Sequence, residues 1–335
     1  MSRKSFAKPA GRAAVRSQPL LLAAVMAAFS APAFAQQSQY PDRAIKLIVG
    51  FAPGGIADGI GRIIGQRMSE SLKQTVVVEN RGGASSAIAA RAVLNAPAEG
   101  YTILVSTTAM PINEAAGTFQ GIRPGVDLAP LSISAITPEL LAVSAKSPIR
   151  NLKDLLEDAR KKGGIAYATA GAGTASHIAA EYIFRSENIK AAHVPHQGGA
   201  PALNAVIGGH IEVLSISMPP AVSQVLAGNL RGIAVGAPRR AAALPDVQTA
   251  LEQNYGKYQF TSWVGFFAAA QTPQPIVAKL NSEINKALSS QDISDRLAKL
   301  GFAPNIADVA ATRAMLESEI TKWREAVAVA GYGKK

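Results

Sequence analysis

The chain contains 335 residues, of which 48% are hydrophobic, 17% are charged and none is cysteine. This length corresponds to about two domains of ~150 residues, and the apolar content is sufficient for buried cores. The absence of cysteine excludes disulfides, thiolate zinc sites, cysteine nucleophiles and a lipid anchor on an N-terminal cysteine. With 6% aromatic residues, the chain is poorly suited to stacking on bases, and we expect no nucleic-acid partner.

The first 35 residues have the pattern of a secretory signal peptide. They contain an apolar run, Leu20–Phe29, a small-residue site, Ala33-Phe34-Ala35, and no acidic residue. The basic residues of this segment all precede the apolar run: Arg3, Lys4, Lys8, Arg12 and Arg16. Because the run is too short to span a bilayer, we predict cleavage after Ala35 and export of a soluble protein to the periplasm. The alternative is a basic amphipathic helix on a membrane surface.

Strands and helices alternate in the next part of the chain. Apolar residues at helical spacing run from Ile60 to Leu72, between short segments of β type. The patterns predict strands over 44–49, 75–79 and 101–106 and helices over 60–72 and 86–94. Residues 111–130 are rich in glycine and proline and predict a loop with room for a short helix. This alternation predicts an α/β fold with a largely parallel sheet.

A second set of elements begins with a strand over 140–143. Leu152, Leu155, Leu156 and Ala159 share one face of a helix that ends at Gly163. The later patterns predict strands over 165–169, 191–194, 211–215 and 230–235, and helices over 178–185, 201–207, 275–289, 292–300 and 309–330.

Three of the predicted strand-to-helix connections contain glycine and lack lysine and arginine. They are residues 51–58 (FAPGGIAD), 169–177 (TAGAGTASH) and 196–201 (HQGGAP). Glycine lets the backbone approach a ligand closely, and the helix that follows begins with unpaired amides and partial positive charge. Such loops bind anions without a basic side chain, at the carboxyl ends of the strands. Taken singly, each loop is equally well interpreted as a tight connection without a ligand.

The sequence contains neither G-x-S-x-G, nor H-E-x-x-H, nor the phosphate loop G-x-x-x-x-G-K-[ST]. We therefore expect no enzyme activity, no cofactor and no metal. Some side chains keep two interpretations. His177 either touches the ligand or its loop or is a structural histidine, and Asp58 either caps a helix start or holds its loop. His193 and His196 lack nearby carboxylates, which disfavours a metal pair, and Trp263 either lines a cleft or packs in the core.

Ordered motifs along the chain resemble one family. They include Tyr40-Pro41, Ala52-Pro53-Gly54-Gly55 with Asp58, residues 76–81 (VVVENR), Glu99-Gly100-Tyr101-Thr102, residues 171–177, His193-Val194-Pro195, residues 198–202, Leu230-Arg231, residues 244–247, Trp263-x-Gly265 and residues 275–288. Together they resemble the Bug (TctC-like) extracytoplasmic solute receptors of tripartite tricarboxylate transporters, from Tyr40 to about Ala328.

The resemblance implies a two-lobed periplasmic-binding-protein fold (type II, Venus-flytrap) with a ligand cleft between the lobes. Lobe 1 would comprise residues 36–138 and 261–335, and lobe 2 residues 139–260. The family binds small carboxylates through loop amides, small hydroxyls and bridging waters, and delivers them to membrane subunits of the transporter. We therefore expect a monomeric receptor for a small carboxylate, held by lobe closure. The alternatives are an envelope hydrolase or oxidoreductase acting on a small acid, an adhesive envelope protein, and a sensor input without transport.

Carried over by position, the resemblance implies a set of ligand-binding residues. They are Pro53, Gly54, Gly55, Ala57, Asp58, Thr107, Thr108, Asn113, Thr169, Gly171, Gly173, Thr174, His177, Gln197, Gly198, Gly199 and Ala200. In the first lobe, we expect the amides of Gly54 and Gly55 and the helix start to hold one carboxylate. The chain departs from the family at residues 83–86 (GASS), where the family is richer in glycine, and at Ala57 and His196. These departures leave the identity of the carboxylate open.

Overall fold

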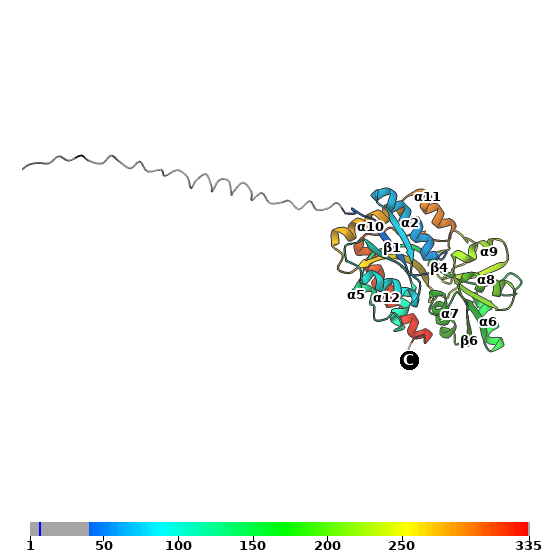
Figure 1. Ribbon diagram of the computed structural model, residues 1–335. Coiled ribbons are helices and arrows are strands. Elements are labelled where there is room, and N and C mark those ends of the chain that lie inside the picture. Colours follow the sequence, from blue (N-terminus) through cyan, green and yellow to red (C-terminus); the bar gives the residue numbers. More distant parts are fainter. Residues whose placement is uncertain (1–6, 8–39, 334–335) are drawn as a thin grey trace, which may run out of the picture. The chain divides into compact units, whose positions relative to one another are not determined.

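In the computed structural model, one long strand, β4 (Leu128–Ser144), belongs to two sheets (Figure 1). As far as Pro138, β4 pairs with β9 (Thr261–Ala269). From Glu139 onwards, it pairs with β7 (Val213–Ser217). We call the part built around the first pairing the first half, and the part built around the second pairing the second half.

The structure describes Ala7 and residues 40–333, so the expected signal peptide, apart from Ala7, lies outside the described residues. The other strands are β1 (Ile45–Val49), β2 (Val76–Asn80), β3 (Thr102–Thr107), β5 (Ile165–Thr169), β6 (Ala191–Pro195), β8 (Leu230–Val235) and β10 (Ala303–Pro304). The α-helices are α2 (Ile56–Leu72), α3 (Ala87–Leu94), α4 (Ala109–Ala115), α5 (Pro124–Asp127), α6 (Leu152–Lys162), α7 (Ala175–Ser186), α8 (Gly199–Ile207), α9 (Val222–Leu226), α10 (Gln274–Leu288), α11 (Gln291–Lys299) and α12 (Val309–Ala330), with 3₁₀ turns η1 (Ala84–Ser86) and η2 (Pro219–Ala221).

The first half is a sheet covered by helices on both faces. Its strands follow the order β2-β1-β3-β9-β4, in which β1 is parallel to β2 and β3. Because successive strand residues point to opposite faces, Leu47 packs with α2, α10 and α11, whereas Ile48 packs with α3, α4 and α12. Both side chains are almost completely buried.

The second half has the same layered arrangement. Its strands follow the order β8-β4-β7-β5-β6, with β5 parallel to β6 and β7. Tyr167 of β5 packs with α6, α7 and the end of α12, whereas the next residue, Ala168, packs with α8 and α9. Within each half, the carboxyl ends of the parallel strands therefore lie at one edge of the sheet.

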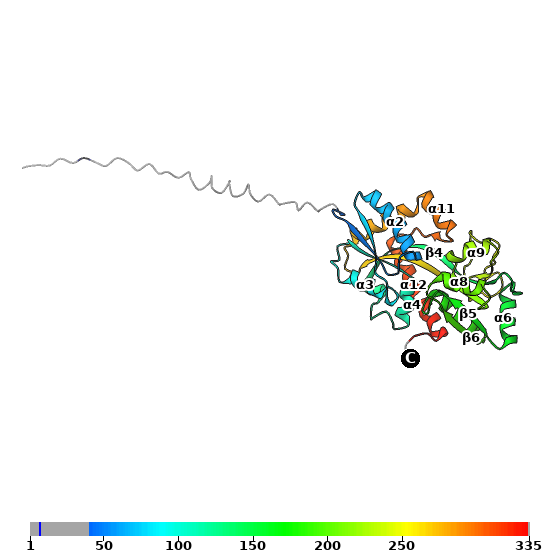
Figure 2. The same ribbon diagram turned by 45° about the vertical axis from the view of Figure 1, so that its right-hand side comes forward.

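The last helix, α12, packs against both halves. Leu316, near its start, belongs to the core of the first half, whereas Trp323 and Val327 belong to the core of the second half. The end of α12 lies beside α7 in Figure 1, and Figure 2 shows the same arrangement from a second side. No helix of the described residues is both long and apolar enough to cross a membrane.

Most predicted elements agree with the structure, and three have the predicted bounds: β5, β8 and α12. Helix α2 begins at Ile56, four residues before the predicted start at Ile60. Asp58 and Gly59 have low helix propensity, which hides the first turn from the sequence pattern. The prediction of a largely parallel sheet holds for β1, β2 and β3 and for β5, β6 and β7, but β4 and β9 are antiparallel to their neighbours.

The prediction for residues 111–130 is only partly right. The segment contains most of α4, the whole of α5 and the start of β4 at Leu128. Proline normally interrupts a strand, and β4 contains Pro130 and Pro138. The structure accommodates Pro130 where the register between β4 and β9 shifts. The first part of β4 is also buried on both faces, so it shows no alternation of polar and apolar residues.

Candidate functional site

The three glycine loops follow parallel strands at their carboxyl ends. The first glycine loop, residues 51–55, joins β1 to α2; the second, residues 170–174, joins β5 to α7; and the third, residues 196–198, joins β6 to α8. In open α/β sheets, ligands bind beyond the carboxyl ends of the strands. These loops therefore lie at the two sheet edges where a ligand is expected.

The first glycine loop is held by an ionised carboxylate. Gly54 has a φ of +83°, a conformation that favours glycine, and its amide donates to Oδ2 of Asp58 (3.0 Å). Asp58 is 5% exposed and also accepts from Nδ2 of Asn80 (2.9 Å) and Nε of Arg62 (3.1 Å). The hydrogen bond from Arg62 is the main cause that lowers the pKa of Asp58 to about 2. Asp58 thus holds the loop, and Arg62 balances its charge.

The start of α2 leaves backbone amides without a hydrogen-bond acceptor in the described part of the chain. Gly55 is the N-cap residue and has no side chain to satisfy the first turn. Among the described residues, the amides of Gly55, Ile56 and Ala57 have no hydrogen-bond acceptor. Residues 52–55 are exposed, whereas Ala57 and Asp58 are buried. Because the Gly54 amide is occupied by Asp58, the amides available to an anion begin at Gly55.

The second glycine loop is held by neutral side chains. The amide of Gly173 donates to Nδ1 of His177 (3.2 Å), and the hydroxyl of Thr174 accepts from the His177 amide (3.3 Å). Thr174 also donates to the carbonyl of Gly171 (2.8 Å), and Oγ1 of Thr169 accepts from the Gly171 amide (3.2 Å). In this loop Gly173 is buried and Gly171 and Thr174 are half-buried, and Thr169 before it and His177 after it are buried.

His177 belongs to a stack of rings. It stacks on His193 with ring centroids 4.0 Å apart, and His193 stacks in turn on Tyr167 at 5.1 Å. Burial, followed by the neighbouring charge of His193, lowers the pKa of His177 to about 4. Nδ1 therefore keeps its lone pair at neutral pH and accepts from Gly173. Burial lowers the pKa of His193 as well, and its Nε2 lies 2.7 Å from Oγ1 of Thr169.

The third glycine loop lies beside the second. The amide of Gly198 donates to the carbonyl of Ala170 (3.0 Å), and the amide of His196 donates to the carbonyl of Thr169 (3.0 Å). Gln197 is exposed at the turn. The two remaining predicted residues follow it, Gly199 half-buried and Ala200 exposed. The structure thus brings the second and third loops together in the second half.

Near these loops, α4 and the chain end connect the two halves. Nδ2 of Asn113 donates to the carbonyl of Ala109 (2.7 Å) and reaches the carbonyl of Gly173 (3.5 Å). A Cβ on Gly173, whose φ is +72°, would lie 2.5 Å from the hydroxyl of Tyr332. The ring of Tyr332 meets His177 edge-on at 5.2 Å. Gly173 is therefore enclosed by groups from other elements, and a side chain there would displace them.

Two predicted threonines are buried, Thr107 at the end of β3 and Thr108 directly after it. Oγ1 of Thr108 accepts from the amide of Trp263 (2.7 Å), and Oγ1 of Thr107 accepts from the amide of Ala109 (3.2 Å). Each hydroxyl therefore retains one hydrogen to donate. Trp263 is fully buried in the core of the first half, and its Nε1 donates to Glu319 (2.9 Å). Of its two interpretations, the core position is the one found.

The segment before α3 carries backbone strain. Residues 83–86 have consecutive φ values of 129°, 46°, 52° and 76°, although only the first is glycine. Each non-glycine residue in this region costs about 1 kcal/mol or more, and such strain clusters at functional sites. The hydroxyl of Ser86 lies 2.6 Å from that of Ser106. The segment adjoins the first glycine loop, because a Cβ on Gly82 would lie 3.4 Å from the amide nitrogen of Ala52.

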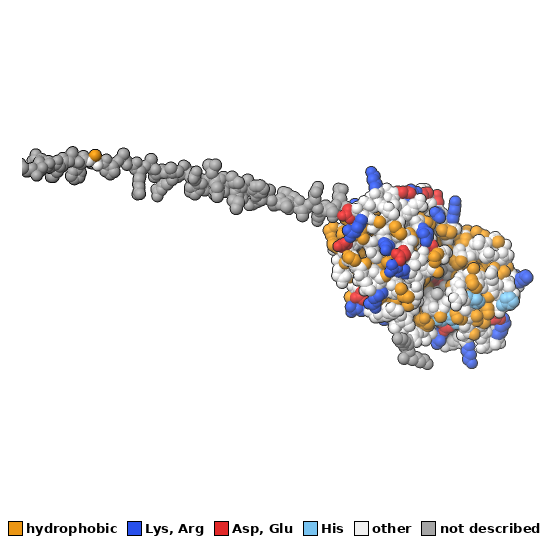
Figure 3. All heavy atoms as spheres, viewed as in Figure 1, with side chains coloured by type: hydrophobic (Ala, Val, Ile, Leu, Met, Phe, Trp, Pro, Cys, Tyr) orange, Lys and Arg blue, Asp and Glu red, His pale blue; other side chains and the backbone are white. Residues whose placement is uncertain are grey.

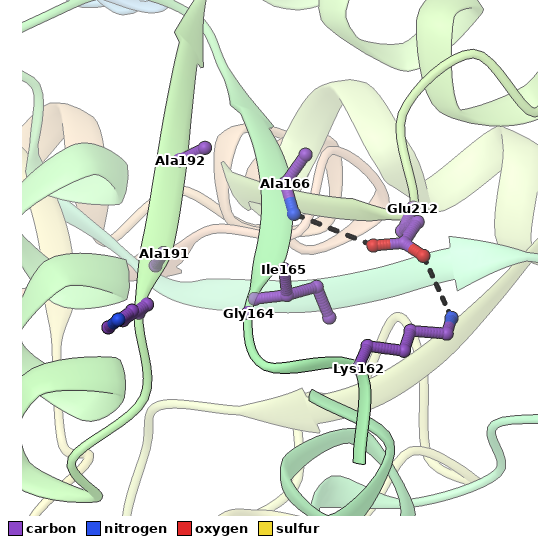
Figure 4. A pocket seen from close by; sticks show the side chains of 8 residues that line it. Lys162, Gly164, Ile165, Ala166, Ala191, Ala192 and Glu212 are labelled. Atoms are coloured by element: carbon purple, nitrogen blue, oxygen red, sulfur yellow. Dashed lines mark hydrogen bonds and ion pairs between the residues drawn. The ribbon is translucent and has the colours of Figure 1, made fainter. Parts of the chain in front are cut away.

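A pocket at the opposite edge of the sheet in the second half differs from the glycine-loop edge in its polar groups. It has a volume of about 460 Å³ and lies at the amino ends of β5 and β6 (Figure 4). Its acidic residue is paired within the protein, because Glu212 accepts from Nζ of Lys162 (2.8 Å) and from the amide of Ala166 (3.5 Å). By contrast, the amides of Gly55 to Ala57 have no such partner. The geometry favours the edge with the glycine loops.

Some neighbours of the predicted site were not anticipated. Arg62 lies four residues after Asp58 on one helix face, a spacing that predicts an ion pair. Asn80 and Tyr332 reach the loops from distant parts of the chain, and no local pattern indicates this.

Within the described residues there is no group of three His, Asp or Glu side chains placed to hold a metal ion. Histidine side chains appear on the face of the second half seen in Figure 3.

The fold is that of periplasmic solute-binding proteins. The structure of R. palustris Rpa4515 with adipate is 29% identical and has a TM-score of 0.79, covering 88% of this chain and 99% of that one. MatC (Rpa3494) from Rhodopseudomonas palustris with bound malate is 29% identical, with a TM-score of 0.75 and coverage of 86% and 100%. Protein BugT of Bordetella pertussis is 30% identical over 295 residues, which cover 87% of this chain and 90% of BugT.

The family model described as "Tripartite tricarboxylate transporter family receptor" (TctC) matches residues 60–331. The chain therefore belongs to the TctC family, the Bug-type receptors that the sequence motifs resemble. This family consists of solute-binding receptors.

Proposed function

We propose that this chain binds one small organic carboxylate between the first and second glycine loops. The observation that carries the proposal is the set of unpaired amides at Gly55, Ile56 and Ala57. Hydrogen bonds to a charged group contribute about 1.5–3 kcal/mol each and a helix start about 0.3–1 kcal/mol. Three or four such contacts approach the ~8 kcal/mol of micromolar affinity before ordering costs. Relatives with bound adipate and malate support this ligand class.

The second half supplies the other side of the site. We assign Thr169, Gly171, Thr174 and Gln197 to Ala200 to this side, with Asn113, Thr107 and Thr108 at the junction. A ligand that contacts both halves stabilises the closed form. The division into lobe 1 (36–138 and 261–335) and lobe 2 (139–260) is supported by β4, which changes partners between Pro138 and Glu139.

We also propose where this protein acts and which membrane proteins receive its ligand. The pattern of residues 1–35 supports export to the periplasm after cleavage of a signal peptide. Family membership supports delivery of the carboxylate to membrane subunits of a tripartite tricarboxylate transporter. We propose a monomeric receptor without catalysis, for which reversible closure is sufficient for capture and release.

The role of the first loop is tested with Gly55→Val. Gly55 has φ −78° and ψ 172°, and a Cβ there would lie 3.5 Å from the nearest atom, the carbonyl oxygen of Ala52, so valine fits the backbone. The valine side chain would cover the free amides, and we expect at least a ~100-fold loss of affinity, equivalent to about 2.8 kcal/mol. Isothermal calorimetry with a panel of small carboxylates, including adipate and malate, measures this loss.

The matched control is Gly59→Ala, on the same helix. Gly59 is exposed and a Cβ there meets no atom within 4 Å, so alanine leaves the loop intact. We expect wild-type affinity for this variant. Unchanged affinity in Gly55→Val would remove the first loop from the site, and a wild-type protein that binds no carboxylate would contradict the proposed function.

A further inference from the structure

A buried acid joins the two halves where β4 crosses between the sheets. Glu139 is fully buried, and its Oε1 accepts from the hydroxyl of Ser217 on β7 (2.9 Å) and from that of Ser262 on β9. Its other oxygen, Oε2, is buried without a hydrogen-bond partner among the described residues. Ser217 belongs to the second half and Ser262 to the first, so this serine–glutamate cluster spans the junction.

The cluster lies at the level of the glycine loops. Ser217 is the last residue of β7. In the parallel pairing of β7 with β5, Leu214 lies opposite Ala168, so Ser217 lies at the level of the second glycine loop. Ser262 precedes Trp263, whose amide donates to Thr108 at the carboxyl end of β3. Ser217 is half-buried, although the rest of β7 is buried. Because Glu139 and Ser262 are buried, Ser217 is the member of the cluster with exposed surface.

The hydrogen bonds within the cluster decide whether Ser217 offers a donor or an acceptor at its exposed surface. A serine hydroxyl has one hydrogen and two lone pairs. Ser262 donates to Glu139, and Ser217 donates either to Glu139 or to Ser262 (3.1 Å). In both arrangements the Ser217 hydrogen points into the cluster, and its free lone pairs accept from outside. A carboxylate placed against Ser217 would have to break this bond.

The groups around Glu139 do not reverse this polarity. The hydroxyl of Tyr258 is also buried without a partner, and the Nζ of Lys322 is paired with Glu319. Burial raises the pKa of Glu139. When Glu139 is ionised, both of its oxygens are acceptors, and Oε1 accepts from the two serines. In this state the exposed surface of Ser217 is an acceptor.

We propose that the cluster of Glu139, Ser217 and Ser262 selects a monocarboxylate whose far end carries a hydrogen-bond donor, a hydroxyl or ammonium group, over a dicarboxylate. This inference rests on the proposed function, in which the free amides of the first glycine loop hold the carboxylate. The donor at the far end meets the lone pairs of Ser217, whereas a second carboxylate meets an acceptor and a buried acid. Ser217 is a specificity-determining residue, and Glu139 and Ser262 position its hydrogen.

The test compares acids of equal length. Calorimetry on the wild-type protein uses succinate, 4-hydroxybutanoate and 4-aminobutanoate, and then adipate, 6-hydroxyhexanoate and 6-aminohexanoate. In the series that fits, we expect at least one donor-ended acid to bind about tenfold or more tightly than its diacid, the effect of one hydrogen bond to a charged or buried partner. The hydroxyl and ammonium arms show which donor is preferred. Diacids that bind equally or more tightly in both series overturn the inference.

Variants separate the cluster from the rest of the site. Ser217→Ala removes the exposed acceptor, and we expect the preference to fall to about twofold or less while some binding of the acids persists. Glu139→Gln keeps the shape but places an amide beside the serines, and we expect the preference to shift toward diacids. Ser223→Ala, at an exposed serine of α9, is the control and should bind as wild type does.

The outcomes distinguish the two proposals. If the wild-type protein binds none of the acids, the proposed function fails and the inference fails with it. If acids bind but Ser217→Ala keeps the wild-type preference, only the role of the cluster is contradicted. If the variants do not fold, as judged by circular dichroism, the wild-type series still decides between donor-ended acids and diacids.

Discussion

The first and second glycine loops use one geometry with opposite chemistry. In each, a glycine amide donates to a side chain four residues later: Gly54 to Asp58 (3.0 Å) and Gly173 to His177 (3.2 Å). Asp58 is ionised and balanced by Arg62, whose side chain is 52% exposed. His177 is neutral, stacks on His193 and meets the ring of Tyr332 edge-on. An ion pair suits a loop at the surface, and a neutral acceptor suits a loop enclosed by other elements.

The two loops also differ in how many backbone amides they leave without a partner at the helix start. The second loop has a side-chain cap, Thr174, whereas the first has Gly55 at the corresponding position. A capped helix start has satisfied part of its own amides, and an uncapped one keeps them for an anion. Under the proposed function, this difference favours the first half as the site that binds the anion.

The largest expected effect is a loss of folding stability at low pH, caused by His177 beside the second glycine loop. The pKa of His177 is lowered from 6.5 to about 4, so the unfolded chain takes up a proton below pH 6.5 that the folded protein refuses. Stability from this group is complete above pH 6.5 and falls as the pH drops to 4, by up to about 3 kcal/mol. Asp58, with a pKa of about 2, stays ionised throughout this window.

Thermal unfolding between pH 7 and 4.5 measures this loss. We expect the wild-type Tm to fall across the window and His177→Gln, which cannot gain a proton, to show a flatter dependence. His210→Gln, at an exposed turn residue, is the control and should retain the wild-type slope. Identical slopes in the wild type and His177→Gln would contradict the assigned role of this histidine.

A smaller effect is expected from Asp58→Asn. Asparagine keeps an acceptor for the Gly54 amide but loses the charge that pairs with Arg62. We expect a loss of about 2 kcal/mol, because hydrogen bonds to charged groups contribute about 1.5–3 kcal/mol. Urea denaturation measures the change. Glu157→Gln, in an exposed pair with Lys153, should lose less than ~0.5 kcal/mol, and a comparable loss in both variants would refute the distinction.

The smallest effect concerns the cap of the second loop. Thr174→Ala removes the acceptor of the His177 amide and the donor to the Gly171 carbonyl. We expect a loss of about 1 kcal/mol and faster amide hydrogen exchange in the first turn of α7. Thr174→Ser retains the hydroxyl and should restore most of the loss. If serine fails to restore it, the methyl group and not the cap stabilises this turn.

Local patterns were sufficient where an element decides its own structure. The bounds of β5, β8 and α12 follow from short apolar runs and clear end signals. The ion pair of Asp58 with Arg62 could have been predicted from their spacing on one helix face. By contrast, β4 was largely missed because its two prolines and its burial on both faces erase the alternation that marks a strand.

The sequence by itself determined the alternation of most strands and helices, the glycine loops and the absence of cysteine chemistry, since each depends on neighbouring residues. Only the tertiary structure decided which loop amides are free, because their acceptors come from side chains placed by folding, such as Asp58 and His177. It also decided the meeting of Glu139 with Ser217 and Ser262, which are 78 and 123 residues away in the chain. Long-range contacts of this kind depend on how the halves pack, and no local pattern records them.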